Sequence, residues 1–255
     1  MSLKSINSAE LVPLDIFTSL YPIAIDLVYA NEKHPENIFG AVYRPDARLW
    51  LHRDFTAVVL LASLICSGKK PGIRFQAKDG LRTVEAQTLM SQSEAVRKNP
   101  HWIDDSDQLL SPPGKGAHPR AMAIDVVLID ENGGQLEMGT PFDFLSKDRY
   151  NNPAARDYEA ISQKAKDNRD LLESSMMEAA HKLGMPLLPL PSEWWDFRFS
   201  QSVTDDYGPL WDADLPGQMR MTKLCGTAPL FPDYAEKHFE SLKNRITETV
   251  SHHLG

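Results

Sequence analysis

The segment from 117 to 130, AHPRAMAIDVVLID, contains an apolar run that is interrupted only by Asp125. The run begins at Ala121 and predicts a buried β-strand. Alternate side chains of a strand share a face, so Ala121, Ala123 and Asp125 should line one side. A buried carboxylate needs a cation or several hydrogen-bond donors, because an uncompensated charge costs many kcal/mol. Either an arginine or a metal ion shared with His118, in the loop that feeds the strand, would meet this need.

Helical and extended patterns alternate along the rest of the chain. Apolar residues at helical spacing with stop signals mark the helices, and short runs bounded by turn residues mark the strands. The expected helices cover residues 50–68, 84–99, 154–184 and 233–250, and the expected strands 73–77, 121–129 and 193–199, with a loop over 101–116 and a turn at 132–134. This order favours an α+β fold with a small central antiparallel sheet flanked by helices. No shift in composition suggests a linker, which predicts a single domain over residues 1–255.

Composition narrows the class of protein. Hydrophobic residues make up 42% and charged residues 24% of the chain, as in soluble globular domains. The formal net charge is −8 and the basic residues are scattered, so we expect no nucleic-acid partner. Cys66 and Cys225 are the only cysteines, which favours reduced thiols. The chain starts without a secretory pattern, and no stretch approaches the roughly 20 apolar residues of a membrane helix. We therefore expect a cytoplasmic protein with no membrane contact.

Further charged residues stand beside aromatic residues and turns. Glu193 and Asp196 lie three apart around two tryptophans in PSEWWDFRF. Large aromatic side chains can exclude water from a charged site, although an edge strand with solvated charges has the same pattern. Arg82 follows a turn and precedes a predicted helix, and Asp143 follows a Gly-Thr-Pro turn. Each of these two also fits a structural role, as a solvated arginine and a turn aspartate.

Taken in order, these segments resemble the VanX-type D-alanyl-D-alanine dipeptidases, zinc peptidases related to the D,D-carboxypeptidases and the hedgehog fold. The family's zinc motif, S-x-H-x-x-G-x-A-x-D, corresponds to GAHPRAMAID, which keeps His118 and Asp125 but has Gly116 for Ser and Ala121 for Gly. The family's other segments D-G-Y-R-P, M-G-T-x-F-D, E-W-W-H and Y-A-x-x-N-F-x-G correspond to DGLRT, MGTPFD, EWWD and, with extra residues inserted, DLVYANEKHPENIFGAVY. All five segments occur in the family's order, which makes the resemblance specific.

The resemblance implies a metallopeptidase with one zinc ion per chain, bound on the sheet by His118, Asp125 and Asp196. Glu193 would act as the general base, taking a proton from water and passing it to the leaving amine, and Arg82 would steady the oxyanion. Positions three apart on a strand face opposite ways, so a bend is expected between Glu193 and Asp196. The substrate-binding residues implied by the resemblance are Asp143, for the substrate ammonium, Gly116 and Tyr43.

Asp196 departs from the family, which has a histidine at this position. The set His118, Asp125, Asp196 carries two negative charges, which should weaken the metal as a Lewis acid and widen the choice toward Mn²⁺ or Fe²⁺. Three outcomes are open: a working peptidase with this set, a site completed by another residue such as His181, or an enzyme that has lost its activity. We favour the first, because Arg82, Glu193 and the two tryptophans are retained together and because a buried Asp125 without a metal ion would be costly.

The expected function is therefore a metal-dependent dipeptidase for D-alanyl-D-alanine or a related small dipeptide with a D-amino acid. The alternatives are a D,D-carboxypeptidase acting on peptidoglycan peptides and a non-catalytic, metal-bearing binder of cell-wall fragments. The missing leader argues against the carboxypeptidase, whose polymer lies outside the cytoplasm. A dipeptidase needs a closed pocket, and the inserted residues 31–43 are a candidate for its lid.

Overall fold

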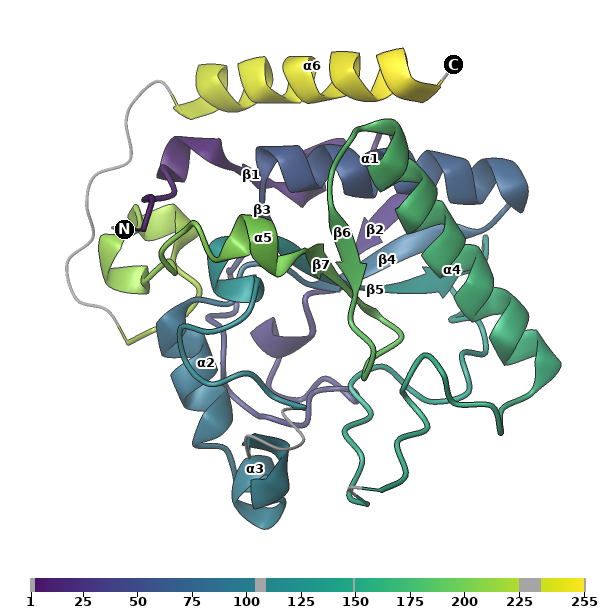
Figure 1. The fold of residues 1–255 in the computed structure, drawn as a ribbon. Helices are drawn as coiled ribbons and strands as arrows, with labels where there is room; N and C mark the ends of the chain where they lie inside the picture. Colours follow the sequence, from purple (N-terminus) through teal and green to yellow (C-terminus); the bar gives the residue numbers. More distant parts are fainter. Residues whose placement is uncertain (1–2, 104–108, 149, 225–234, 255) are drawn as a thin grey trace.

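The computed structural model describes residues 3–103, 109–148, 150–224 and 235–254 (Figure 1). The α-helices in these ranges are α1 (Arg53–Lys69), α2 (Val84–Ser91), α3 (Glu94–Lys98), α4 (Gln163–Lys182), α5 (Gln201–Thr204) and α6 (Ala235–Leu254). The β-strands are β1 (Leu11–Pro13), β2 (Ile23–Ile25), β3 (Trp50–His52), β4 (Arg74–Asp79), β5 (Ala123–Ile129), β6 (Leu187–Pro189) and β7 (Asp196–Phe199). This mixture is an α+β fold, as predicted.

The larger sheet has five strands in the order β2-β4-β5-β7-β6, and a second sheet pairs β1 with β3. The pairs β4–β5, β5–β7 and β6–β7 are antiparallel, as predicted, whereas the edge pair β2–β4 is parallel. β5 is the central strand and all seven of its residues are buried, which explains its apolar sequence.

Helix α1 is apolar nearly all round and lies between α6 and the sheet, with α4 packed beside it (Figure 1). A helix that is apolar on every side must be covered on every side. α1 begins at Arg53 rather than at residue 50, because Trp50–His52 pairs with β1 as a strand. His52 caps the helix, its Nδ1 accepting the backbone N–H of Asp54 at 3.4 Å.

Two predicted helices are shorter than expected, and serine caps explain the difference. The helix over 154–184 begins only with α4, where the Ser162 hydroxyl accepts the backbone N–H of Ala165. The helix over 84–99 is divided into α2 and α3, because the side chain of Ser93 starts a new helix. A serine favours these positions because its oxygen satisfies a free N–H group of the first turn.

The strand expected over 121–129 begins at Ala123 instead. Ala121 has a left-handed backbone conformation, φ 53°, at the end of the short 3-10 helix His118–Arg120. Glycine adopts a positive φ without strain, which accounts for the glycine of the family motif at this position. The expectation that Ala121 lines the strand face of Asp125 is therefore wrong.

The other predicted elements are confirmed in outline. The strand over 73–77 is β4, and the helix over 233–250 is α6. The strand expected over 193–199 is β7 only from Asp196 onward, because residues 193–195 lie in the turn before it. The turn at 132–134 is closed by Asp130, whose carboxylate accepts the N–H groups of Asn132 and Gly134. Residues 104–108 of the expected loop and 233–234 of the expected helix lie outside the described residues.

Strand β4 contains a bulge at Lys78. Ala77 pairs with Val126 and Asp79 pairs with Asp125, so two residues of β4 lie opposite one residue of β5. A bulge of this kind re-aims the side chains that follow it. Here it places Asp79 opposite Asp125, the position that Lys78 would take in a regular strand.

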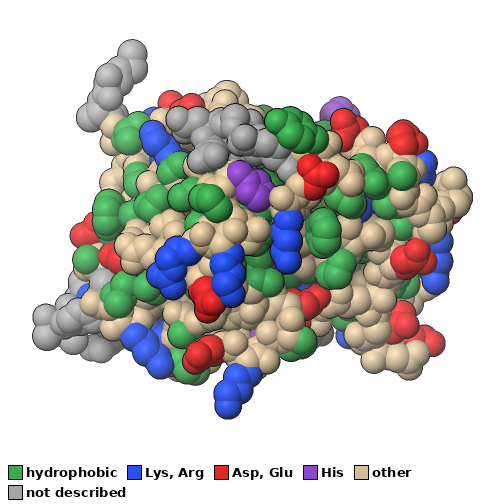
Figure 2. Space-filling view, turned by 90° about the horizontal axis from the view of Figure 1, so that it is seen from below, with side chains coloured by type: hydrophobic (Ala, Val, Ile, Leu, Met, Phe, Trp, Pro, Cys, Tyr) green, Lys and Arg blue, Asp and Glu red, His purple; other side chains and the backbone are tan. Residues whose placement is uncertain are grey.

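The surface agrees with a scattered charge pattern. Figure 2 shows one face from below, on which acidic and basic side chains are interspersed with hydrophobic ones.

Cys66 is a buried free thiol, whereas Cys225 lies outside the described residues. In the described part of the chain, no helix has both the length and the apolar character needed to span a bilayer. The cytoplasmic location and the single-domain organisation stay predictions.

Candidate active site

Three aspartates lie side by side across three neighbouring strands. Asp79 of β4 is the register partner of Asp125 of β5, and Asp125 is the register partner of Asp196 of β7. All three are at most 2% exposed. Like charges directly opposite one another destabilise a sheet, so the row requires compensating cations.

Two arginines, the buried Arg82 and the largely buried Arg198, contact the row of aspartates. Arg82 donates from Nε to Asp79 at 2.9 Å and from Nη2 to Asp125 Oδ2 at 3.2 Å. Arg198 donates from Nε to Asp196 Oδ1 at 2.8 Å and from Nη2 to Asp196 Oδ2. Burial alone would raise the pKa of Asp196, but Arg198 and His118 hold it well below its usual range. Sequence analysis missed Arg198, although two residues apart on a strand share a face.

His118 lies between the free oxygen of Asp125 and the Asp196 Oδ2 atom that also accepts from Arg198. Its Nδ1 lies 2.7 Å from the carbonyl oxygen of Gly80, which only accepts, so Nδ1 carries the hydrogen and Nε2 faces the aspartates. Nε2 lies 3.4 Å from Asp125 Oδ1 and 3.3 Å from Asp196 Oδ2. Burial and Arg82 lower the pKa of His118, but Asp125 and Asp196 outweigh both and raise it to about 10.

The donor set of this site fits a divalent cation. Asp125 Oδ1 is buried and makes no hydrogen bond among the described residues, so its lone pairs are available. One imidazole nitrogen and two carboxylate oxygens are ligands that zinc accepts, and the carbonyl bond at Nδ1 orients the imidazole as in known metal sites. Asp125 can therefore pair with an arginine and bind a metal ion at the same time. Arg82 contacts one of its carboxylate oxygens and leaves the other free for the ion.

Asp79 forms a candidate metal group with His118 and Asp125, and Asp196 forms one with Asp125 and Glu193. Asp79 is the poorer candidate ligand because, unlike Asp196, it is not among the residues that line the cavity. The hydroxyl of Tyr43 donates to its Oδ1 at 2.7 Å, and Arg82 occupies its Oδ2. Asp79 therefore acts as a support for Arg82. Tyr43 is not among the residues that line the cavity, so its position does not support the expected substrate contact.

Glu193 projects from the turn that leads into β7. Asp125, Glu193 and Asp196 each offer an oxygen within 4.8 Å of the others. The backbone N–H of Asp196 donates to the carbonyl of Glu193 at 3.4 Å, which confirms the predicted bend. Burial, followed by the charges of Asp196 and Asp125, raises the pKa of Glu193 well above its usual range. A cation beside the same carboxylates would act in the opposite direction.

Aromatic and basic side chains hold this turn in place. Trp194 and Trp195 are buried and pack edge to face, with ring centroids 5.2 Å apart, as expected of a water-excluding wall. Arg156 bridges the ends of the turn, donating from Nε to the carbonyl of Leu190 and from Nη2 to the carbonyl of Asp196, both at 2.8 Å. The turn therefore presents Glu193 on a rigid support.

The site opens into a cavity of about 530 Å³, a size typical of small-molecule sites. The predicted residues that line it are Arg82, Gly116, His118, Asp125, Asp143, Glu193 and Asp196. Asp143 has a left-handed backbone, φ 59°, and accepts the hydroxyl hydrogen of Tyr29 at 3.0 Å. Burial is the main cause that raises the pKa of Asp143 to about 7, against the opposing effect of Arg82. By contrast, His181 is exposed at the end of α4 and belongs to none of the candidate metal groups among the described residues.

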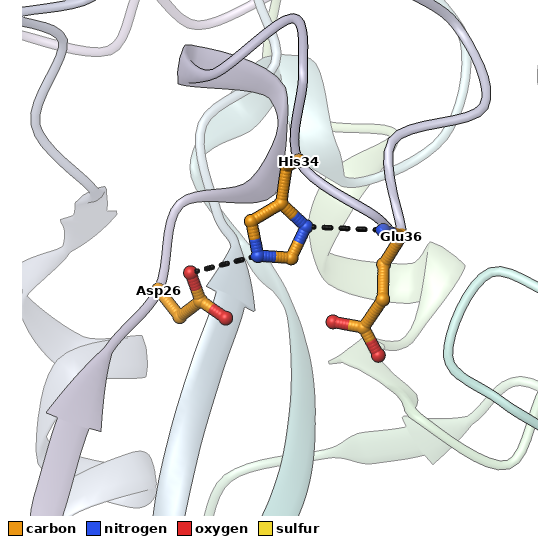
Figure 3. Close-up of side chains that lie close together, drawn as sticks. All are labelled: Asp26, His34 and Glu36. Atoms are coloured by element: carbon orange, nitrogen blue, oxygen red, sulfur yellow. Dashed lines mark hydrogen bonds and ion pairs between the residues drawn. The ribbon is translucent and has the colours of Figure 1, made fainter.

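A separate group of possible ligands, Asp26, His34 and Glu36, lies in and near the predicted lid (Figure 3). His34 Nε2 lies 3.3 Å from Asp26, and its Nδ1 accepts the backbone N–H of Glu36. The buried ammonium of Lys78 already binds Asp26 at 2.6 Å and Glu36 at 2.7 Å. This cation satisfies the group and ties the loop 31–43 to the bulge of β4.

Comparison with known proteins agrees with these motifs. A family model, Peptidase M15, described as D-ala-D-ala dipeptidase, matches residues 7–210. A D-alanyl-D-alanine dipeptidase of Escherichia coli (strain K12) is 28% identical over 199 residues, covering 78% of this chain and 89% of that protein. Among solved structures, the L-Ala D-Glu endopeptidase ChiX of Serratia marcescens has a TM-score of 0.34 at 18% identity, over 60% of this chain and 82% of that one.

Proposed function

Because the chain belongs to the Peptidase M15 family of D-ala-D-ala dipeptidases, we propose that it is a metal-dependent dipeptidase that hydrolyses D-alanyl-D-alanine or a related small dipeptide with a D-amino acid. Membership of this family makes the chain a peptidase, which is a hydrolase. The metal, the roles of the side chains and the choice of dipeptide are parts of the proposal.

His118, Asp125 and Asp196 are the residues that would hold the metal. The convergence of His118 Nε2 with an oxygen of each aspartate supports this assignment. Zn²⁺ suits one nitrogen and two oxygens, and Mn²⁺ or Fe²⁺ also suits an oxygen-rich set. When bound, the ion supplies a Lewis acid that polarises the scissile carbonyl and acidifies water.

Glu193 is the proposed general base. It accepts a proton from the attacking water and donates it to the leaving amine, because the same carboxyl faces the cavity in both steps. Its position on a turn held by tryptophans and Arg156 supports this role, since a general base must stay within reach of the reacting atoms.

Arg82 and Asp143 are proposed to hold the substrate. Arg82 lines the cavity with its guanidinium fixed by two aspartates, which suits a preorganised stabiliser of the oxyanion. Asp143 lines the same cavity and carries a strained backbone, which supports a functional role for this carboxylate at the substrate ammonium.

The observation that carries the proposal is the meeting of His118, Asp125, Asp196 and Glu193 in one cavity beside Arg82. Its test is incubation of the zinc-reconstituted protein with D-alanyl-D-alanine and a panel of dipeptides of mixed chirality, with detection of free amine. Amine release from a dipeptide with a D-amino acid is the expected result. Release only from longer peptidoglycan peptides would favour a carboxypeptidase, and binding without release would favour the binder of cell-wall fragments.

A further inference from the structure

Arg198 occupies the place where this chain departs from the motifs of its family. The family pattern has a histidine at 196, and this chain has an aspartate that is paired through both of its oxygens with Arg198. Both side chains project from the same face of β7, and the pair lies in the wall of the cavity.

We propose that Arg198 is a positioning residue that allows an aspartate to serve as a metal ligand at position 196. It holds the Asp196 carboxylate beside His118 and offsets its charge. The proposal rests on the metal site of the proposed function and adds a residue to it.

The charge of the donor set supports this role. His118, Asp125 and Asp196 together carry two negative charges, and the largely buried guanidinium of Arg198, in bidentate contact with Asp196, offsets one of them. The remaining single negative charge is that of a set with two histidines and one aspartate. The exchange of histidine for aspartate at 196 weakens the metal as a Lewis acid if the ligands alone are counted. Side chains that contact the ligands also tune a metal, and Arg198 is such a side chain.

A second departure from the family pattern lies at the same guanidinium. Gly116 replaces the usual serine, and a Cβ at this position would lie 3.6 Å from Arg198 Nη1 and 3.0 Å from Ser111 Oγ. Any side chain at 116 would therefore start in contact with the guanidinium. The two differences from the family, at 116 and 196, are thus related through Arg198.

The test is a double-mutant cycle of Asp196→His, Arg198→Gln and the double variant. The Zn²⁺ dissociation constant of each metal-free protein is measured by competition with a chromophoric chelator. Asp196→His leaves Arg198 as an unpaired cation beside the metal, so it should weaken Zn²⁺ binding by about tenfold or more. The added Arg198→Gln should return the dissociation constant to within about threefold of the wild type. Arg198→Gln alone should change the absorption spectrum of the Co²⁺ form, because the carboxylate loses its support.

Three results would overturn the proposal. The first is an equal effect of Arg198→Gln on Zn²⁺ binding in both backgrounds. The second is coupling in the melting temperatures of the metal-free proteins with none in Zn²⁺ binding, which would identify a purely structural ion pair. The third is a wild type that binds no Zn²⁺ while the double variant does, since Arg198 would then keep Asp196 from the ion.

Failure of the proposed function is distinguishable from these results. A coupled cycle in a protein that hydrolyses no dipeptide would support the role of Arg198 and contradict the dipeptidase. Hydrolysis by the wild type with additive effects on Zn²⁺ binding would do the reverse.

Discussion

His118 donates its Nδ1 hydrogen to the carbonyl oxygen of Gly80 at 2.7 Å, so the proposed ligand and the DGLR turn form one unit. The turn also carries Asp79 and Arg82, and the guanidinium of Arg82 compensates the carboxylates of Asp79 and Asp125 beside His118. A shift of the turn would therefore disturb the histidine, the arginine and their aspartates together.

Gly80→Ala should destabilise the protein through this turn. The added Cβ would lie 2.8 Å from Leu49 Cδ2 and 2.9 Å from the carbonyl oxygen of Trp50, too close for either atom. We expect the free energy of unfolding, measured in urea, to fall by about 1–3 kcal/mol, with weaker Zn²⁺ binding. Gly68→Ala is the matched control, because its Cβ meets no atom within 4 Å, and it should leave stability equal or higher. Equal effects of the two substitutions would contradict the packing argument.

Glu193→Gln should remove hydrolysis without removing the metal. The amide keeps the shape of the side chain but cannot accept the proton, so kcat should fall by about 10²- to 10⁴-fold. Metal content and amine release measured on the same preparation check this result. Glu178→Gln, on the exposed surface of α4, is the control and should leave both unchanged. Loss of metal from Glu193→Gln would instead identify Glu193 as a ligand.

Purified protein should contain about one divalent ion per chain, held by the three proposed ligands. Removal of the ion with a chelator should abolish hydrolysis and lower the melting temperature, because a ligand that binds only the folded state stabilises it. Added Zn²⁺ should restore both. His34→Ala should keep its metal, since Lys78 already satisfies the group around His34. Metal analysis that finds no ion after reconstitution with zinc and manganese would refute the metal site.

Lys78→Met should release the loop 31–43 from β4. The substitution leaves Asp26 and Glu36 without their shared cation, so we expect the free energy of unfolding to fall by about 2–4 kcal/mol. Hydrogen exchange of the loop should accelerate, and KM should rise because Phe39 of this loop lines the cavity. Lys69→Met removes an exposed ion pair with Glu178 and should change stability by about 0.5 kcal/mol or less. An unchanged exchange rate in Lys78→Met would show that the loop has other anchors.

The stability of the protein should depend on pH through His52, at the start of α1. Burial, opposed by Asp54, lowers the pKa of His52 below its usual 6.5, so the folded state binds fewer protons than the unfolded state. This contribution to stability is complete above about pH 6.5 and is lost as the pH falls through the lower pKa of the folded state. His52→Asn keeps a capping oxygen and should flatten this part of the profile, measured by urea unfolding at several pH values. Parallel profiles for the two proteins would exclude His52 as the cause.

Much of the site was predictable because its motifs are local. The order of residues already shows a carboxylate in an apolar run, a histidine just before it and an acidic residue beside two tryptophans. These features can be recognised because burial and strand alternation act over a few positions. The bend before Asp196 followed from the same reasoning, because only a bend brings positions three apart to one site.

The partners of those residues depended on contacts between distant segments. The bulge at Lys78 set Asp79 opposite Asp125, and pairing of β5 with β7 set Asp125 opposite Asp196. Only the tertiary structure shows that Tyr43 supports Asp79 rather than facing the cavity and that Lys78 holds the loop. The pairing of Arg198 with Asp196, by contrast, is local to β7. The order of residues specifies which charges exist, but the cost of burying each charge depends on the charges that neighbouring strands place beside it, and only the folded sheet determines those neighbours.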